Sequence, residues 1–308
     1  MGGSGGSYFG TGDLESVKRQ LQEAQDRSAD PDYVSSCNEL LASLLVNFND
    51  RDLDAIGVHL QEIEAALARE LIGSVNIMFG GSVSKNTYID GFSDVDALVM
   101  LDSCELADGT PSAARAYFAT RLRDRFPATP VHEGDLAVTI SFSDVDIQLL
   151  PAISCRGHLK ISQPGGSAWA PIRPREFTAA LTRRNDEVGK KLVPTIKLAK
   201  AIIALLPPQQ RVAGYHAEAL GVDVFRGYQG PFSHKEMLRY YFQKGAQRVL
   251  QPIRDSTGQS VHVDEALGPS ESLSRRIISD AFGRIARRMS NADSAGRVDE
   301  WRQLFTER

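Results

Sequence analysis

The chain has few cysteines and no long apolar run, and both features narrow the classes of protein to which it can belong. Its three cysteines, Cys37, Cys104 and Cys155, are far apart and odd in number. Disulfide frameworks and zinc sites need paired or clustered cysteines, so we expect reduced thiols and a cytoplasmic protein. No apolar run reaches the length of about eighteen residues that a membrane span needs.

The chain also has no overall basic charge. Its formal net charge is −4, which gives no global signature of nucleic-acid binding. Segment 155–200 is different, because it holds ten Lys or Arg against three Asp or Glu. The first residues are mostly Gly and Ser without the apolar core of a signal peptide, so we expect residues 1–12 to be a leader or a cloning scar.

Small residues at 80–82 form the first half of a motif. Gly81 lets backbone N–H groups approach an anion closely, and the hydroxyls of Ser82 and Ser84 can add hydrogen bonds to phosphate oxygens. An ordinary turn has the same composition. The pattern alone therefore predicts a turn that is suited to phosphate.

Carboxylates on predicted strands form the second half. Asp94 and Asp96 begin the run 94–101, and residues two apart on a strand face the same side. Two such carboxylates repel each other unless a cation lies between them, and oxygen ligands favour Mg²⁺ or Mn²⁺. A third carboxylate is expected from the run 136–150. Asp146 is preferred there, because Val and Ile flank it, and Asp144 is the competing candidate.

These motifs resemble, in their order, those of the nucleotidyltransferase superfamily of DNA polymerase beta, poly(A) polymerases and the cyclic-nucleotide synthases. The resemblance implies that Asp94 and Asp96 ligate two Mg²⁺ ions, for which Mn²⁺ can substitute. It also implies that Asp146 holds the catalytic metal and helps to deprotonate the attacking hydroxyl.

The periodicity along the chain predicts an α+β fold with two lobes. The first lobe would hold the motif strands, a long spine helix before residue 80, and the helices and strands up to residue 150. A Gly-, Pro- and Ser-rich segment over 151–178 predicts a long irregular connection. We expect a polymerase beta-like nucleotidyltransferase lobe over 13–176, including the N-terminal helices, and a helical lobe over 177–308 that closes the nucleotide pocket.

With these helices placed, the chain resembles more closely the bacterial cyclic GMP-AMP synthase and DncV-like nucleotidyltransferases, or CD-NTases, of CBASS antiphage defence. In this family a lysine of the helix at 194–206 contacts the donor triphosphate, and Lys200 fits best, followed by Lys197. Gly214-Tyr215-His216 is similar to a Ser-Tyr-His element whose ring stacks on the nucleobase. Tyr215 is therefore the base-stacking candidate, and a core-edge tyrosine is the alternative interpretation.

The resemblance implies an enzyme that joins ribonucleoside triphosphates, ATP among them, into a cyclic di- or trinucleotide second messenger with release of pyrophosphate. A regulatory protein of the same defence system is a further expected partner. The animal cyclic GMP-AMP synthase of this family senses DNA through a zinc finger. This sequence has no Cys/His cluster that could form one. We therefore expect neither a DNA activator nor a membrane partner.

Two other functions are compatible with the sequence. The first is nucleotidyl transfer to another acceptor, which would be a small molecule, a protein or an RNA 3′ end. No separate basic RNA-binding domain supports the RNA alternative. The second is a catalytically silent module that binds a nucleotide or a partner. Loss of one of the three aspartates would favour it, and all three are present.

Overall fold

The sheet lobe is built around one mixed sheet. The computed structural model describes residues 11–48, 53–68, 74–79, 85, 87–89, 95–102, 109–155, 158–163, 166–253 and 263–306. Within them, seven strands form one sheet in the order β1-β2-β5-β4-β3, with β6 paired to β5 and β7 paired to β6. The strands are β1 Ser74–Phe79, β2 Val95–Asp102, β3 Val131–Glu133, β4 Val138–Ser141, β5 Asp146–Cys155, β6 His158–Ser162 and β7 Trp169–Ile172. Only β2 and β5 pair in parallel among these described strands.

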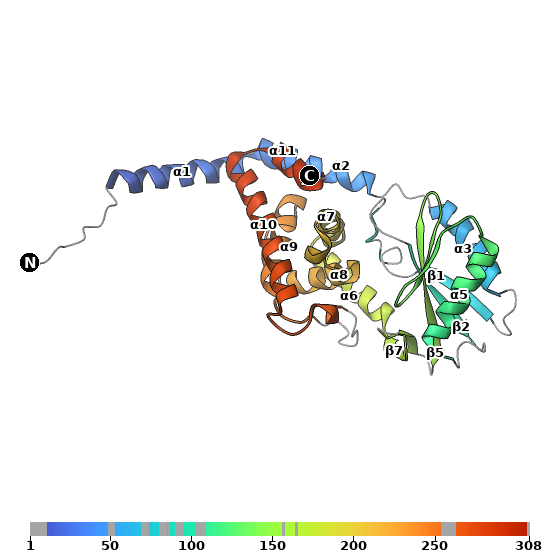
Figure 1. Ribbon diagram of the computed structural model, residues 1–308. Helices are drawn as coiled ribbons and strands as arrows, with labels where there is room; N and C mark the ends of the chain where they lie inside the picture. Colours follow the sequence, from blue (N-terminus) through green and yellow to red (C-terminus); the bar gives the residue numbers. More distant parts are fainter. Residues whose placement is uncertain are drawn as a thin grey trace, which may run out of the picture.

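One face of this sheet is apolar, and helices α3 (Leu53–Ala68) and α5 (Pro111–Arg125) cover it (Figure 1). The central strands bury every second residue against these helices, namely Val95, Ala97, Val99, Ile147 and Leu149. Because side chains alternate along a strand, Asp96 and Asp146 lie on the opposite face. That face is turned toward the helical lobe (Figure 1).

Local sequence signals set the starts of two helices. Helix α2 (Pro31–Asn47) begins after Asp30, whose carboxylate accepts a hydrogen bond from the backbone N–H of Tyr33. Helix α5 begins in the same way after Thr110, which accepts from the N–H of Ala113. Both helices have proline in the first turn, where the missing N–H removes no helical hydrogen bond.

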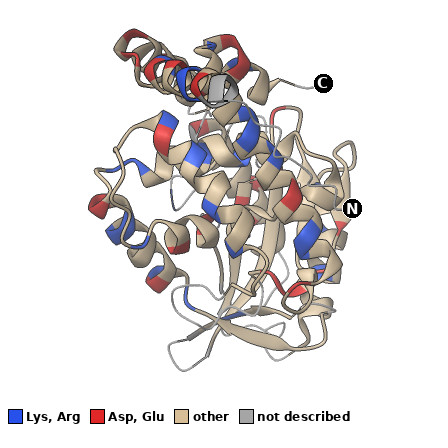
Figure 2. Ribbon diagram, turned by 90° about the vertical axis from the view of Figure 1, so that its left-hand side faces the viewer, with Lys and Arg blue, Asp and Glu red and all other residues tan. Residues whose placement is uncertain are grey.

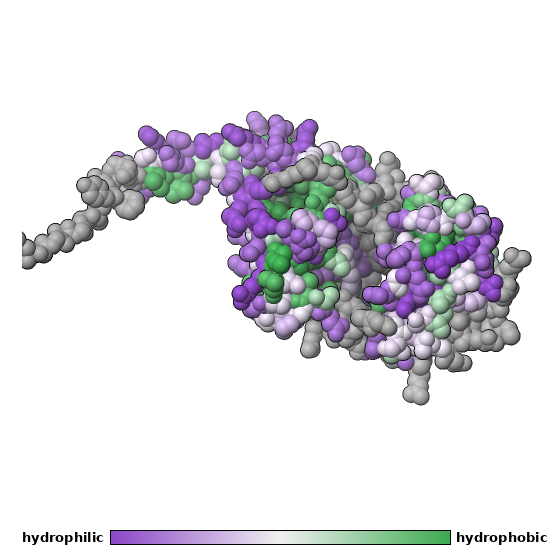
Figure 3. All heavy atoms as spheres, in the orientation of Figure 1, coloured by the Kyte–Doolittle hydropathy of each residue, from purple (hydrophilic) through white to green (hydrophobic). Residues whose placement is uncertain are grey.

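The helical lobe surrounds a second core. Its helices are α1 Thr11–Ala29, α2, α6 Pro174–Glu187, α7 Leu192–Ala204, α8 Gly214–Val224, α9 His234–Arg248, α10 Leu273–Ala295 and α11 Val298–Arg302, with short 3-10 turns at Pro208–Gln210, Glu265–Leu267 and Gln303–Phe305. Helix α1 extends away from the lobe (Figure 1), and Figure 3 shows hydrophobic atoms exposed along it. Val17 and Leu21 of this helix are exposed by more than half. No described helix is long and apolar enough to cross a membrane.

A buried polar network connects helix α2 with helices α10 and α11 within this lobe. Tyr33 of α2 donates its hydroxyl hydrogen to Asp293 of α10 at 2.9 Å, and the indole of Trp301 donates to the Tyr33 hydroxyl oxygen at 3.0 Å. The ammonium of Lys235 lies 3.1 Å from the Asp293 carboxylate. Helix α2 therefore belongs to the helical core, whereas the sequence analysis placed the N-terminal helices with the sheet lobe.

The segment 151–178 differs from the predicted irregular connection. It continues β5 to Cys155 and then forms β6, β7 and the start of α6. Proline is tolerated here for positional reasons, because Pro171 lies on β7, whose described pairing is with β6 alone. The prediction of a long irregular connection is therefore wrong, because the Gly- and Pro-rich composition concealed an antiparallel extension of the sheet.

Candidate active site

Strand register brings carboxylates together at one end of the sheet. Asp96 of β2 is paired with Gln148 of β5, and Asp146 lies two residues before Gln148 on the same face. The side chain of Asp146 is exposed, and that of Asp96 is half-buried. Asp94 lies outside the described residues. Asp96 and Asp146 thus share a solvent-accessible face of the sheet. The face that the sequence predicts Asp94 to share with Asp96 stays a prediction.

Asp144 is directed to a different neighbour. It lies in the turn between β4 and β5, and its carboxylate is 3.2 Å from Nε2 of His59 on α3. The imidazole of His59 stacks on Phe142 with the ring centres 4.0 Å apart. Helix α3 covers the apolar face, opposite to Asp96. This contact supports Asp146 rather than Asp144 as the third carboxylate.

The donor set on this face fits a hard divalent cation. Asp96 and Asp146 offer oxygen ligands on neighbouring strands, and water has access to complete an octahedral shell. No cluster of three His, Cys, Asp or Glu is found among the residues that the structure describes. The predicted third member, Asp94, lies outside them.

Across from the carboxylates, a buried ion cluster joins the two lobes. The ammonium of Lys200 on α7 lies 2.6 Å from Oε1 of Glu218 on α8, and donates to the carbonyl oxygen of Thr87 at 3.1 Å. The Thr87 hydroxyl donates to the same Glu218 oxygen, and the ammonium of Lys85 pairs with Oε2. These four residues, Lys85, Thr87, Lys200 and Glu218, are called the Glu218 cluster below.

One carboxylate serves two ammonium groups in this cluster. Glu218 is 1% exposed and Lys200 is 8% exposed, so both charges are largely removed from water. Burial alone would raise the pKa of Glu218, but the charges of Lys200 and Lys85 outweigh it and lower that pKa. The carboxylate is therefore ionised. Burial lowers the pKa of Lys200, against the opposing charge of Glu218, and the cluster has one positive charge in excess while both lysines are protonated. That excess charge makes it a receptor for an anion such as phosphate.

Glycines position the helix that carries Glu218. A β-carbon on Gly221 would lie 2.9 Å from side-chain atoms of Ile196, so the absence of a side chain allows α8 to approach α7 closely. A β-carbon on Gly214 would lie 3.6 Å from the ammonium nitrogen of Lys200. The position at which the sequence departs from the Ser-Tyr-His pattern is therefore directly beside the lysine.

The other predicted nucleotide contacts are distributed around the cluster. Lys197 is buried, and its ammonium lies 4.3 Å from the ring centre of Tyr88. Tyr215 is half-buried with an edge-on contact to Phe177 at 4.7 Å. Lys85 lies 5.0 Å from the ring centre of Tyr215, which links this ring to the Glu218 cluster. Gly81, Ser82 and Ser84 lie outside the described residues.

The basic segment 155–200 does not form a uniform positive surface. Arg173 pairs with Glu176 at 3.1 Å, and Arg184 pairs with Glu187. Lys197 and Lys200 are buried. Figure 2 shows basic and acidic segments interspersed over the ribbon. The positive charge that concerns the site is therefore local to the Glu218 cluster.

Sequence reasoning missed Lys85, Thr87 and Glu218. A signal for Glu218 was available, because it is the acidic residue in an otherwise apolar turn of a helix, Ala217 to Leu220. Buried acidic residues require a cationic partner. The identity of that partner depends on contacts between residues 131 positions apart, as for Thr87 and Glu218.

Comparison with known proteins agrees with this geometry at the level of the fold. No protein-family model matches the chain, and no curated protein matches it. The CD-NTase CdnG of Bradyrhizobium diazoefficiens, solved with GTP, is similar with a TM-score of 0.64 and 12% sequence identity, over 86% of this chain and 93% of that one. The DncV cyclic AMP-GMP synthase of Vibrio cholerae, solved with the linear intermediate 5′ pppA(3′,5′)pG, is similar with a TM-score of 0.60 and 12% sequence identity. The match covers 96% of this chain and 89% of that one.

The CdnC protein of Escherichia coli MS115-1, solved in complex with HORMA-deltaN, gives a TM-score of 0.60 and 19% identity, over 84% of this chain and 91% of that one. The chain therefore has the α+β fold of these CD-NTase structures, with a sheet lobe packed against a helical lobe.

Proposed function

We propose that this chain is a template-independent nucleotidyltransferase that joins ribonucleoside triphosphates into a cyclic di- or trinucleotide, with release of pyrophosphate. The observation that carries the proposal is the position of two strand carboxylates, Asp96 and Asp146, on the sheet face toward the Glu218 cluster. The charge of Asp96 is near enough to act on Lys200. The similarity to solved cyclic dinucleotide synthases supports the same chemistry.

Each residue has a role in this proposal. Asp94, Asp96 and Asp146 would hold two Mg²⁺ ions, which when bound would neutralise phosphate charge and polarise the reacting oxygens. The carboxylate of Asp146 would take up the proton of the attacking hydroxyl. Lys200 and Lys85 would bind the triphosphate, together with the turn that contains Gly81, Ser82 and Ser84. Tyr215 would stack on a nucleobase, and Lys197 is the second candidate for the contact with the triphosphate.

Ring closure places a demand on the site. After the first bond forms, the linear product must bind again with its own triphosphate at the Glu218 cluster and its free hydroxyl near Asp146. The site must therefore hold two nucleotides between the lobes. Positioning of these groups supplies most of the rate.

The test is a product analysis. The purified chain is incubated with all four ribonucleoside triphosphates and Mg²⁺ or Mn²⁺, treated with phosphatase and examined by mass spectrometry. Phosphatase-resistant species at the mass of a cyclic di- or trinucleotide support the proposal. A nucleotide adduct on an added acceptor would favour the alternative transferase, and metal-independent nucleotide binding without products would favour a silent module.

The biological role follows from the same proposal. A cyclic nucleotide made by this chain would act in the cytoplasm as an antiphage signal. The CdnC complex with HORMA-deltaN supports a regulatory protein as a partner for this chain. Addition of such a protein from the same genetic neighbourhood should raise the rate of product formation if regulation of this kind exists here.

A further inference from the structure

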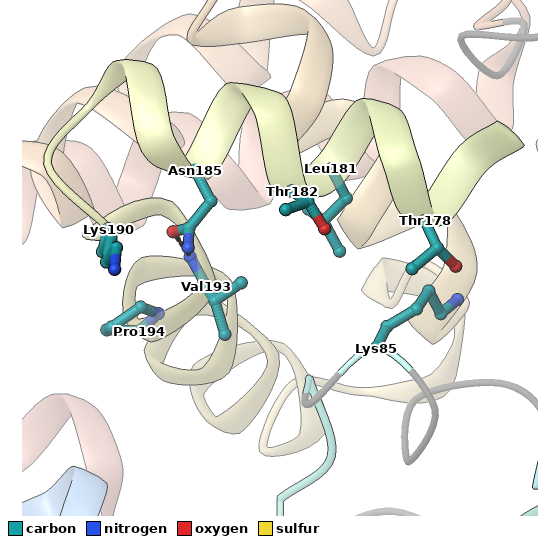
Figure 4. A pocket seen from close by; sticks show the side chains of 8 residues that line it. All are labelled: Lys85, Thr178, Leu181, Thr182, Asn185, Lys190, Val193 and Pro194. Atoms are coloured by element: carbon teal, nitrogen blue, oxygen red, sulfur yellow. Dashed lines mark hydrogen bonds between the residues drawn. The ribbon is translucent and has the colours of Figure 1, made fainter. Parts of the chain in front are cut away.

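A cavity lies beside the Glu218 cluster, along one face of helix α6. Its volume is about 380 Å³. Thr178, Thr182 and Asn185 line it from α6, with Lys85 at one end and Lys190 at the other (Figure 4). The three α6 residues follow one another at spacings of four and three, so they form a single polar edge on the helix.

The lining combines apolar walls with polar groups. Leu181, Val193 and Pro194 supply the apolar part, and the hydroxyl and amide groups of α6 supply the polar part (Figure 4). A nucleobase has the complementary chemistry, because its faces are apolar and its edges carry hydrogen-bond donors and acceptors. The middle of the cavity, between its two lysines, is therefore matched to a base.

Existing hydrogen bonds fix what each polar side chain can offer. The hydroxyl of Thr178 donates to the carbonyl oxygen of Pro174 at 2.9 Å, so it can only accept from a ligand. The carbonyl oxygen of Asn185 accepts from the backbone N–H of Val193 at 3.0 Å, which leaves the amide N–H groups as donors. The hydroxyl of Thr182 is exposed and can do either.

Lys85, at one end of the cavity, belongs to the Glu218 cluster that would bind phosphate. Lys85 contacts the ring of Tyr215 and the carboxylate of Glu218, so a base in the cavity would lie next to the proposed stacking ring. Lys190 has a left-handed backbone with a φ of 61°, directly after Gly189 with a φ of 62°. This conformation is uncommon for a residue with a side chain, and it holds the lysine at the cavity.

We infer that this cavity selects the base of one of the two nucleotides, and that Thr182 and Asn185 read its edge. The inference rests on the proposed function and adds substrate preference to it. Because Asn185 presents donors, the selected base presents a carbonyl oxygen, as guanine and uracil do. Adenine and cytosine present an amino group at the same edge position and bind less well.

The experiment exchanges the donor for an acceptor. Asn185→Asp keeps an oxygen for the N–H of Val193 and replaces the amide donors by a second acceptor oxygen. With an equimolar mixture of the four triphosphates, we expect wild-type products to contain guanine or uracil at one position. In the variant, the ratio of guanine and uracil to adenine and cytosine at that position should fall about fivefold or more. Thr182→Val should shift the same ratio by less. Because Thr182 lies inside α6, this change leaves the ends of the helix intact.

Asp186→Asn is the matched control. It makes the reverse exchange at the next position of α6, which is exposed and does not line the cavity. It should leave the base ratio unchanged. Wild-type products without guanine or uracil would overturn the inference, as would an unchanged ratio in Asn185→Asp with normal turnover.

A binding measurement separates this inference from the proposed function. Thermal stabilisation of the wild-type chain by each triphosphate is compared with that of Asn185→Asp. If no product forms at all, the proposed function fails, but stabilisation by GTP or UTP that is lost in the variant still supports the base site. Equal stabilisation by all four triphosphates in both proteins contradicts it.

Discussion

The two halves of the candidate site are built in opposite ways. In the sheet lobe, the carboxylates of Asp96 and Asp146 are at least partly accessible to water at the end of two parallel strands. In the helical lobe, Lys200 and Glu218 are buried and hold each other at 2.6 Å. The sheet half is accessible to water and carries carboxylates. The helical half is buried and has two lysines for one carboxylate.

This difference shows how each half would be kept in place without substrate. Exposed carboxylates stay hydrated, so their mutual repulsion is screened and costs little until a cation binds. Buried ammonium groups have no such option and require a counter-ion within the fold. The sheet half can therefore lose a carboxylate and remain folded, whereas the helical half depends on Glu218.

The largest effect on activity is expected from the sheet half. Asp96→Asn or Asp146→Asn removes a ligand for the metal, whose stabilisation of several kcal/mol corresponds to a rate loss of about 10³-fold. The melting temperature should be unchanged or slightly higher, because a repelling charge is removed. Product formation and thermal unfolding are measured on the same preparations.

Asp144→Asn is the comparison for these variants, because Asp144 contacts His59 on the other side of the sheet. It should retain most of the activity. A loss as large as that of Asp146→Asn would make Asp144 the third ligand instead. Full activity in Asp96→Asn would remove the basis of the metal assignment.

The largest effect on stability is expected from Glu218→Gln. The variant leaves two buried ammonium groups without a carboxylate, and breaking a buried pair in this way costs about 3 to 5 kcal/mol. Denaturation by urea measures this loss. Glu236→Gln is the matched control, because Glu236 also pairs with two basic residues, Lys235 and Arg239, but is less buried. A loss of stability in Glu218→Gln no larger than in the control would contradict the charge argument.

Lys200→Ala should separate function from stability. It leaves Glu218 paired with Lys85, so the cluster becomes neutral and the loss of stability should be smaller than in Glu218→Gln. The apparent KM for triphosphate should rise by about tenfold or more, which corresponds to one lost charged contact of about 1.5 kcal/mol. Lys160→Ala, on β6, should change KM much less. Equal changes in the two variants would mean that the phosphate contact lies elsewhere.

The sheet half could be predicted from the sequence because its signal is local. A strand repeats every two residues, so Asp94 and Asp96 on one strand and the flanked Asp146 on another already define a common face. The pairing of Asp96 with Gln148 agrees with that expectation. The helices after residue 177 were also predictable from their apolar periodicity, and α7 in addition from the prolines near its two ends.

The helical half could be predicted only in part. The sequence identified Lys200 through its resemblance to a family, but it gave no partner for it. Thr87 and Lys85 reach Glu218 only when the segment that follows β1 packs against α7 and α8. Strands β6 and β7 were missed for a related reason. The glycines and prolines that flank them indicate turns, and the pairing that stabilises them comes from neighbouring strands.

The smallest expected effect concerns pH, and it should arise in the helical half. His216 of α8 is 1% exposed, and its burial lowers its pKa to about 4, against an opposing effect of Asp264 and with the support of Arg275 and Arg248. Because the pKa in the unfolded chain is about 6.5, the unfolded chain takes up the proton first as the pH falls. This contribution to stability is complete above pH 6.5 and is lost progressively toward pH 4.

Urea denaturation at pH 7 and pH 5.5 should show a loss of about 1 kcal/mol from this histidine. His216→Gln should reduce the difference in unfolding free energy between the two pH values. His234 should retain a part of that difference, because burial and the nearby charge of Lys191 lower its pKa to about 4. His132→Gln, on the exposed part of β3, should leave the difference as it is. If His216→Gln and the wild type respond equally to pH, His216 does not remain neutral in the folded chain. The water-excluded interior around Glu218 would then not extend to His216, two residues away on α8.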